Sequence, residues 1–360
     1  MKNKLLPIFT GVLISSFIAI ISIYFSALLG TELFGFKKSP VSPILLAIII
    51  GIFISNTSEF LKKFDTGIKF CIKHILKLGI ILMGIRLGLS EMLGFGVKSL
   101  IIVTPCIILT VLLIKKSASI FKLKSTMATL IAVGTSICGA SAIVATAPAI
   151  SAKDEEVVFA IANISIFGIV AMFLYPFVAN VLFPLDSISA GIFLGSSIHE
   201  TAQVAGAGII YSDQFSQPQV LDIATLTKLI RNTAMIIVIP FLSYQSTTVS
   251  RDNSFFLQIK SIFPYFILGF IAFGIFRTIG DVGMNDSGLA FGFLDASKWK
   301  GLIYFINNLS KFLLTIAMSA LGMSTNVEVF RSIGIKVFYY GLTMSFFVGL
   351  VSLVSISILI

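Results

Sequence analysis

Long apolar runs, separated by short stretches in which charged residues gather, dominate the chain. Several runs approach or exceed the roughly 20 residues that a membrane-spanning helix needs, and none alternates like a transmembrane β-strand. The pattern therefore predicts eleven membrane-spanning helices. Their expected ranges are 5–29, 41–55, 67–89, 97–114, 127–150, 157–183, 188–210, 220–244, 256–276, 302–323 and 333–358.

Composition supports this interpretation. Hydrophobic residues make up 57% of the 360 positions and charged residues only 12%, against about a quarter charged in soluble domains. We therefore predict an all-α polytopic membrane protein whose single integral membrane domain covers residues 1–360. The spans leave no room for a sizeable soluble domain, and the first span shows no convincing cleavage site, so we expect it to be retained.

The net charge of +10 is explained by membrane topology rather than by binding to nucleic acid, because the basic residues cluster between apolar runs. With a cytoplasmic N-terminus, fifteen cations fall inside and seven outside, as the excess of Lys and Arg in cytoplasmic loops requires. The odd span count then places the C-terminus outside. The outside set comprises Lys37, Lys38, Lys98, Lys153, Arg277, Lys298 and Lys300.

Two segments interrupt the helical pattern with small and hydroxyl residues, VGTSICGASAIVATA at 133–147 and LGSSIHETAQVAGAG at 194–208. Such segments can unwind at mid-membrane and expose backbone groups to a substrate, although small residues also allow close helix packing. We expect helix breaks at Gly134, Gly139 and Gly195, and substrate-binding hydroxyls at Ser136, Ser141 and Ser197. Aligned without gaps, the segments match at Gly134 and Gly195, Ser136 and Ser197, and Ile137 and Ile198.

This match suggests inverted repeats with approximate halves 1–185 and 186–360. A second sequence similarity is found between LGLS at 87–90 and LGMS at 321–324. These two segments lie in spans that run in opposite directions, as inverted repeats require. By simple counting, however, 133–147 and 194–208 would run in the same direction. Two alternatives stay open: one segment is re-entrant, or one similarity is accidental. The sequence does not decide which spans pair.

An acidic residue well inside a span must find a cation, a proton or a cavity. Glu200 is such a residue, and His199 and Gln203 lie close enough to share its polar sector. We predict that these three residues bind the coupling ion, with a structural hydrogen-bonded cluster as the alternative. A zinc protease is set aside, because Gln203 occupies the place of the second histidine in HExxH.

Lys228, Arg231 and Asn232 share one face of their predicted helix. Each buried cation costs on the order of 2.5–3.5 kcal/mol on insertion scales, and Arg can hold an oxyanion through two parallel hydrogen bonds. We predict that these residues bind an anionic substrate. Arg86 and Lys311 are further candidates, although each lies near enough to a span end for its long side chain to reach the interface instead.

Four motifs in this order, MGIRLGLS at 83–90, GTSICGASAI at 134–143, IHETAQVAGAG at 198–208 and KLIRN at 228–232, resemble the bacterial YeiH family of inner-membrane proteins, to which sulfate export is ascribed. The resemblance covers nearly the whole chain. It implies location in the bacterial inner membrane and a transporter similar to the sodium/proton antiporter and bile-acid symporter group, with inverted repeats and interrupted helices.

The expected function is a secondary transporter that exports a small anion, such as sulfate or a related sulfur oxyanion, coupled to protons or sodium. An anion channel and a carrier of small organic anions remain alternatives.

An enzyme is not expected, because Ser197 and His199 point in different directions on a helix. No cofactor or metal site is expected, since the chain has no nucleotide-binding GxxxxGK[ST] and its cysteines are unpaired in apolar runs. The partners expected are the anion, the coupling ion and the lipid bilayer, with a homo-oligomer left open.

Overall fold

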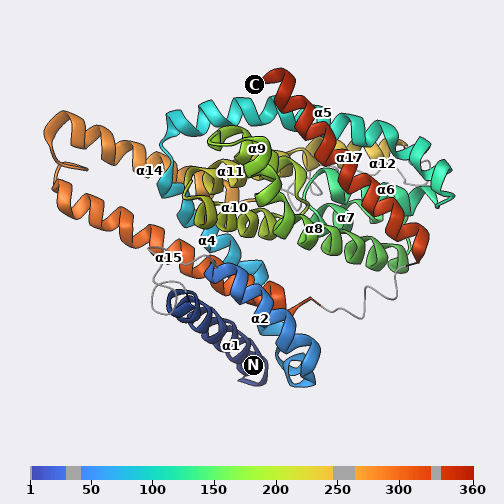
Figure 1. Cartoon of the computed structure of the whole chain (residues 1–360), viewed down its shortest axis with the longest axis horizontal. Helices are drawn as coiled ribbons and strands as arrows, with labels where there is room; N and C mark the ends of the chain where they lie inside the picture. The colour runs from blue at the N-terminus through green and yellow to red at the C-terminus, as the bar shows by residue number, and fades with distance from the viewer. Residues whose placement is uncertain (1, 30–41, 246–263, 326–333) are drawn as a thin grey trace. The chain divides into compact units, whose positions relative to one another are not determined.

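The computed structural model describes residues 2–29, 42–245, 264–325 and 334–360 (Figure 1). Within these ranges every regular element is a helix, apart from one isolated β-bridge between Ala290 and Leu294. Seven of the described helices are long and apolar enough to cross a membrane. The predicted all-helical membrane fold is therefore confirmed. The predicted outside cations Lys37 and Lys38, and the start of the predicted span 256–276, lie outside the described residues.

The chain divides into two compact units. Unit 1 comprises Met1–Gly94, Ile209–Pro218 and Tyr265–Val327, and unit 2 comprises Phe95–Gly208, Gln219–Pro264 and Glu328–Ile360. These units interleave along the sequence, so they differ from the sequential halves 1–185 and 186–360, which remain a prediction about repeats.

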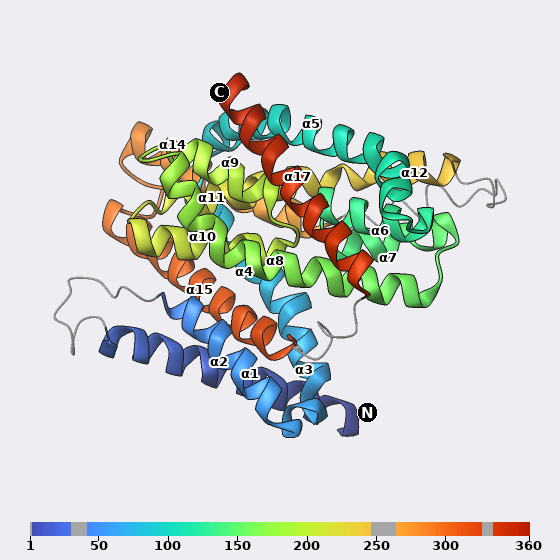
Figure 2. The same ribbon diagram turned by 45° about the vertical axis from the view of Figure 1, so that its right-hand side comes forward.

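Unit 1 is built around a close packing of α1, α2, α4 and α15. Its described elements are α1 (Lys2–Ala27), α2 (Pro43–Thr57), η2 (Glu59–Phe64), α3 (Asp65–Phe70), η3 (Cys71–Ile75), α4 (Leu76–Met83), η4 (Gly84–Arg86), α14 (Phe266–Ser287) and α15 (Ala296–Met323). Helices α1, α2 and α15 lie side by side (Figure 2), and their shared core contains Ile18, Cys71, Ile316 and Ala320.

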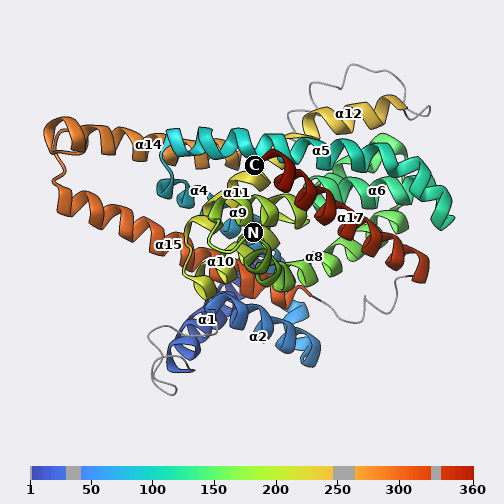
Figure 3. The ribbon, with the colours of Figure 1, turned by 45° about the horizontal axis from the view of Figure 1, so that its top comes forward.

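Helices α14 and α15 form an antiparallel pair within unit 1 (Figure 3). The indole of Trp299 donates to Asp281 at 2.9 Å, which joins the two helices near their connection. Asp295 begins α15 by accepting a hydrogen bond from the backbone N–H of Lys298 at 2.9 Å. That bond stabilises the charged carboxylate and lowers the pKa of Asp295.

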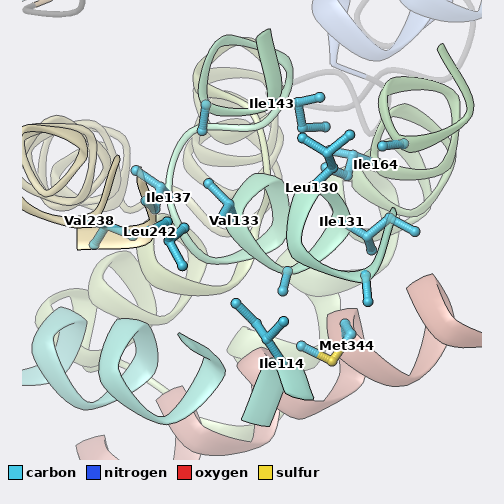
Figure 4. Packing of buried hydrophobic residues seen from close by; sticks show 14 of the residues in the cluster. Ile114, Leu130, Ile131, Val133, Ile137, Ile143, Ile164, Val238, Leu242 and Met344 are labelled. Carbon is cyan, nitrogen blue, oxygen red and sulfur yellow. The ribbon is translucent and has the colours of Figure 1, made fainter. Parts of the chain in front are cut away.

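Unit 2 holds both interrupted segments. Its elements are α5 (Leu89–Phe121, from Phe95 onward), α6 (Ser125–Ser136), α7 (Ala140–Thr146), η5 (Pro148–Ile150), α8 (Asp154–Leu182), α9 (Ser187–Ser197), α10 (Thr201–Phe215, up to Gly208), α11 (Gln219–Thr233), α12 (Met235–Gln245) and α17 (Ile335–Leu359). Aliphatic side chains from α5, α6, α8, α12 and α17 pack together in one core (Figure 4).

The first interrupted segment is a helical hairpin, which we call hairpin A (residues 125–150). A Cβ atom added to Gly134 would lie 2.8 Å from Ile143 Cδ1, although nine residues of continuous helix would separate them by roughly 13 Å. Helix α7 therefore folds back onto α6. The start of α6 meets the start of α8, where Thr126 donates to Glu156 at 2.9 Å.

The second interrupted segment is also a hairpin, hairpin B (residues 187–215). Helix α11 runs parallel to α9, because Gly191 abuts Ile223 and Gly195 abuts Thr227. Helix α10 connects the far end of α9 to the start of α11, so it must run back toward the start of α9. The close approach of Gly208 to Leu221 agrees with this return.

These hairpins correct the predicted topology at two places. The spans expected at 127–150 and 188–210 are each two half-helices that fold back, rather than single crossings. Between them lies α8, with 29 residues and enough apolar character to cross the membrane once. Hairpins A and B then begin at opposite ends of α8, so the directional conflict expected from simple counting does not arise. The inverted repeats themselves stay a prediction.

Candidate functional site

The tips of hairpins A and B meet inside unit 2. Gly139 has φ +75°, a backbone conformation that glycine adopts without steric cost, and a Cβ atom there would collide with the side chain of Glu200. The Glu200 carboxylate accepts hydrogen bonds from the backbone N–H of Ala140 and from the Ser165 hydroxyl of α8. Glu200 therefore lies where α7 begins, while it also precedes the first residue of α10.

Two buried cations of α11 bind the opposite ends of the breaks. Lys228 donates to the carbonyl oxygens of Ile137 at 2.8 Å, Ile198 at 2.9 Å and His199. These three bonds can use all three ammonium donors. Lys228 thus joins hairpin A to hairpin B.

Arg231 makes the same kind of connection with four hydrogen bonds. Its Nε donates to Ser136 O at 2.6 Å, its Nη1 to Ser196 O at 2.7 Å and Ile198 O at 2.9 Å, and its Nη2 to Thr135 O. Both Arg231 and Lys228 have 0% exposure. The two side chains therefore satisfy last-turn and tip carbonyls that have no partner within a helix.

The charges at the tips match the helix dipoles. The C-terminal end of a helix carries partial negative charge and the N-terminal end partial positive charge. Lys228 and Arg231 face the C-terminal ends of α6 and α9, whereas Glu200 lies at the N-terminal ends of α7 and α10. Each broken helix is thus electrostatically compensated on both sides of its break, which is what irregular backbone in a low-dielectric interior requires.

The other predicted coupling residues lie around the same tip but differ in their contacts. Gln203 accepts a hydrogen bond from the backbone N–H of Glu200 at 3.1 Å, in the manner of a capping box. His199 turns away and shares a 2.6 Å hydrogen bond with Ser345 of α17. Asn232 donates to Thr201 at 3.1 Å. The predicted residues therefore lie around the tip of hairpin B, but their side chains form hydrogen bonds with different neighbours.

The predicted substrate hydroxyls are not equivalent. Ser197 bonds the carbonyl of Phe193 within its own helix, and Ser141 is exposed in the first turn of α7. The Ser136 hydroxyl and the Asn232 side-chain oxygen are buried, and neither finds a hydrogen-bond partner among the described residues. Spare hydrogen-bonding capacity therefore exists beside the tips.

The helix breaks lie at residues 137–139 and 198–200. Of the three glycines expected there, Gly139 lies in a break. Gly134 and Gly195 lie inside α6 and α9, where the missing side chain lets Ile143 and Thr227 approach closely. Their contribution is to helix packing.

Arg86 and Lys311 belong to unit 1, whereas the hairpin tips belong to unit 2. Arg86 ends η4 and donates to the carbonyl oxygen of Pro218 at 3.0 Å. Lys311 lies in the middle of α15 and is partly exposed.

Sequence reasoning did not single out Ser165, Ser345 or Ser352. Ser165 bonds Glu200, Ser345 bonds His199, and Ser352 bonds Ser196 at 2.6 Å. The seven-residue spacing of Ser345 and Ser352 places both on one face of α17. That spacing was the available signal, but serine on an apolar helix is too common to identify a site.

Comparison with known proteins places the chain in a family. The family described as conserved hypothetical protein 698 matches residues 10–341. A UPF0324 membrane protein of Fusobacterium nucleatum is 33% identical over 89% of this chain and 91% of its own length. A UPF0324 membrane protein of Streptococcus agalactiae is 35% identical over 81% of each chain. No solved structure matches significantly. The chain therefore belongs to the conserved hypothetical protein 698 family, which includes the UPF0324 membrane proteins.

Proposed function

We propose that this protein is a secondary transporter of a small anion, driven by a proton or sodium ion that binds at Glu200. The observation that carries the proposal is the meeting of two oppositely entering helical hairpins around compensating charges. Interrupted helices whose ends face a common site are the arrangement by which transporters hold substrates and ions near the membrane midplane. Substrate class and coupling follow from the chemistry of that site.

Glu200 is suited to coupling because it is the carboxylate at the hairpin tips and its residue is not fully buried. It keeps part of its surface exposed, whereas Lys228 and Arg231 are fully buried and occupied by carbonyl oxygens. When Glu200 is charged, its carboxylate balances the positive helix ends at the tips. Neutralising it with a proton or a sodium ion leaves those ends without a counter-charge, and an anion is then favoured there.

The direct anion-binding role predicted for Lys228 and Arg231 is replaced in this proposal by an indirect one. An anion bonded to Lys228 would have to displace a backbone carbonyl already within 2.9 Å. We propose instead that both cations hold the tips in register. The anion then binds beside the hairpin tips, with the Ser136 hydroxyl at the end of α6, the Ser141 hydroxyl in the first turn of α7 and the second side-chain N–H of Asn232 as candidate donors. Sulfate or a related sulfur oxyanion is the first substrate to test.

The proposal is tested by reconstituting the protein in liposomes and measuring sulfate, sulfite and thiosulfate flux under imposed pH and sodium gradients. Glu200→Gln should retain anion exchange between equal concentrations but lose the response to the driving gradient. Glu155→Gln, at an exposed position of α8, is the matched control and should behave like the unmodified protein.

Two results would reject the proposal in different ways. Anion flux that follows its own gradient and ignores both cations would favour the alternative of an anion channel. An unchanged pH and sodium dependence in Glu200→Gln would remove Glu200 from coupling.

A further inference from the structure

A stripe of cations lies on the exposed side of the helix formed by α3, η3 and α4 in unit 1. Lys69, Lys73, His74 and Lys77 are all exposed. Lys69 pairs with Asp65 at 2.6 Å, and the His74 ring stacks on Phe70 with centroids 4.6 Å apart. In the part of the chain that the structure describes, no acidic partner is found for Lys73 or Lys77. We call these two residues the lysine stripe.

The register between α1 and α3 fixes the depth of the stripe. Gly11 abuts Gly67, and four residues later Ser15 hydrogen-bonds Cys71, so the helices run in parallel and Lys73 is level with Phe17. The apolar span of α1 is Leu6–Ala27. Its midpoint is close to Phe17, so Lys73 lies about halfway along a segment of roughly 33 Å at 1.5 Å per residue.

Helix α15 gives an independent measure of the same depth. Ser310, near the middle of α15, donates to the carbonyl oxygen of Gly79 at 2.7 Å. Gly79 lies two residues beyond Lys77, so Lys77 is level with the middle of α15. Lys311, the residue after Ser310, adds a further partly exposed cation at this level.

A lysine at this depth cannot reach either membrane surface by extending its side chain. This depth corrects the prediction that Lys73 and Lys77 belong to the fifteen cations on the cytoplasmic side. Cations inside the membrane almost always face a bundle interior or a water-filled cavity. The lipid-facing surface is instead marked on α1, where Leu13 and Phe17 are 51% and 65% exposed. Lys73 and Lys77 are also exposed, but they carry positive charge. The π-helical turn at Cys71–Ile75 supports a functional role, because such turns occur frequently at functional sites.

We propose that Lys73 and Lys77 line a water-filled path that attracts small anions into unit 1. This inference rests on the proposed function and deepens it, since it assigns the attraction of the transported anion to particular residues of unit 1. The Lys77 ammonium lies 5.7 Å from the Phe266 ring centre, which holds it over an apolar surface and leaves its charge available to a passing anion.

The proposal is tested by the reaction of single cysteines with two membrane-impermeant thiol reagents, the anionic sulfonatoethyl and the cationic trimethylammonioethyl methanethiosulfonate. The cysteine variant Lys73→Cys is compared with Phe17→Cys, which lies at the same depth on the apolar face. The unmodified protein, whose three cysteines are buried, gives the background. All reactions are run in phosphatidylcholine vesicles without any ion gradient.

Lys73→Cys should react, faster with the anionic reagent by roughly tenfold, while Phe17→Cys should stay at background. Adding Lys77→Gln should reduce the preference for the anionic reagent, and millimolar sulfate should slow the reaction. An unreactive Lys73→Cys, or equal reaction of Phe17→Cys, overturns the proposal. If phosphatidylglycerol blocks the reaction and sulfate does not, the stripe binds lipid headgroups and the anion path is rejected.

This readout does not depend on coupled transport. Loss of the proposed function would appear in the flux of Glu200→Gln, whereas loss of the anion path would appear in the labelling of Lys73→Cys.

Discussion

Single residues of opposite charge stabilise the two helix breaks. Lys228 and Arg231 bind backbone carbonyls from both hairpins, and Glu200 takes hydrogen bonds at the N-terminal side. A buried cation that satisfies several carbonyls avoids much of its desolvation cost, because hydrogen bonds to charged groups are stronger than neutral ones. The same contacts make these residues poor candidates for free substrate ligands.

Removing the Arg231 guanidinium should therefore destabilise the folded protein. Arg231→Met leaves carbonyls such as those of Ser136 and Ser196 without a donor, at a cost on the order of 3 kcal/mol. Thermal unfolding in detergent should show a clearly lower Tm. The Tm of Arg231→Lys should lie between those of the unmodified protein and of Arg231→Met, because lysine keeps the positive charge but lacks the planar guanidinium group. A wild-type Tm in Arg231→Met would contradict this structural role.

At the scale of elements, hairpins A and B repeat one design. Each helix ends at a serine, Ser136 or Ser197, and each break spans three residues before the next helix begins at Ala140 or Thr201. The equivalent last positions of the breaks are Gly139 and Glu200, and these two residues touch. The gap-free sequence match thus aligns the breaks themselves.

The contact between the two tips can be tested with a pair of glycine variants. Gly139 and Gly288 both have positive φ, +75° and +72°, but an added Cβ meets Glu200 only at Gly139 and meets nothing within 4 Å at Gly288. Both alanine variants should lose stability through backbone strain. Gly288→Ala should lose about 1–2 kcal/mol, because Gly288 lies in the left-handed helical region (φ +72°, ψ +4°). Gly139→Ala should lose more, because Gly139 (φ +75°, ψ −134°) lies outside that region, in a conformation that side chains other than glycine rarely adopt. Gly139→Ala should also impair coupled anion flux in liposomes. Equal transport by the two variants would show that the tip contact is dispensable.

For the whole molecule, the hairpins change which loops share a side. Hairpin A returns to its starting side, so Lys153 joins Lys122 and Lys124 instead of facing the opposite surface. This assignment strengthens the excess of cations on the predicted cytoplasmic side. The outside location predicted for the C-terminus is unaffected, because replacing two crossings by two hairpins keeps the count odd.

Cysteine accessibility in oriented vesicles distinguishes the two topologies. Lys122→Cys and Lys153→Cys flank hairpin A and should react from the same side. Leu185→Cys and Gln219→Cys flank hairpin B and should react from the other side. All four positions are exposed. Single crossings at 127–150 and 188–210 would instead separate the two members of each pair.

Much of the candidate site could be predicted, because charged residues are rare inside a membrane and are easily recognised within an apolar run of sequence. Glu200, Lys228 and Arg231 stand out among apolar residues, and Gly139 lies in a segment too rich in small residues for a regular span. Their partners could not be predicted. Ser345 and Ser352 look like ordinary helix residues until the fold brings α17 against hairpin B.

By itself the sequence determined that the protein lies in a lipid bilayer and that its fold is helical, since the apolar runs can be stable there only as helices. It also determined which two segments contain the helix breaks and which charges must be compensated. Only the tertiary structure decided that 127–150 and 188–210 fold back, because hydropathy is the same for a hairpin of two half-helices as for one crossing. It likewise decided that Lys228 and Arg231 bind carbonyls while Lys73 and Lys77 remain open, since the available partners of a charge depend on packing between distant segments.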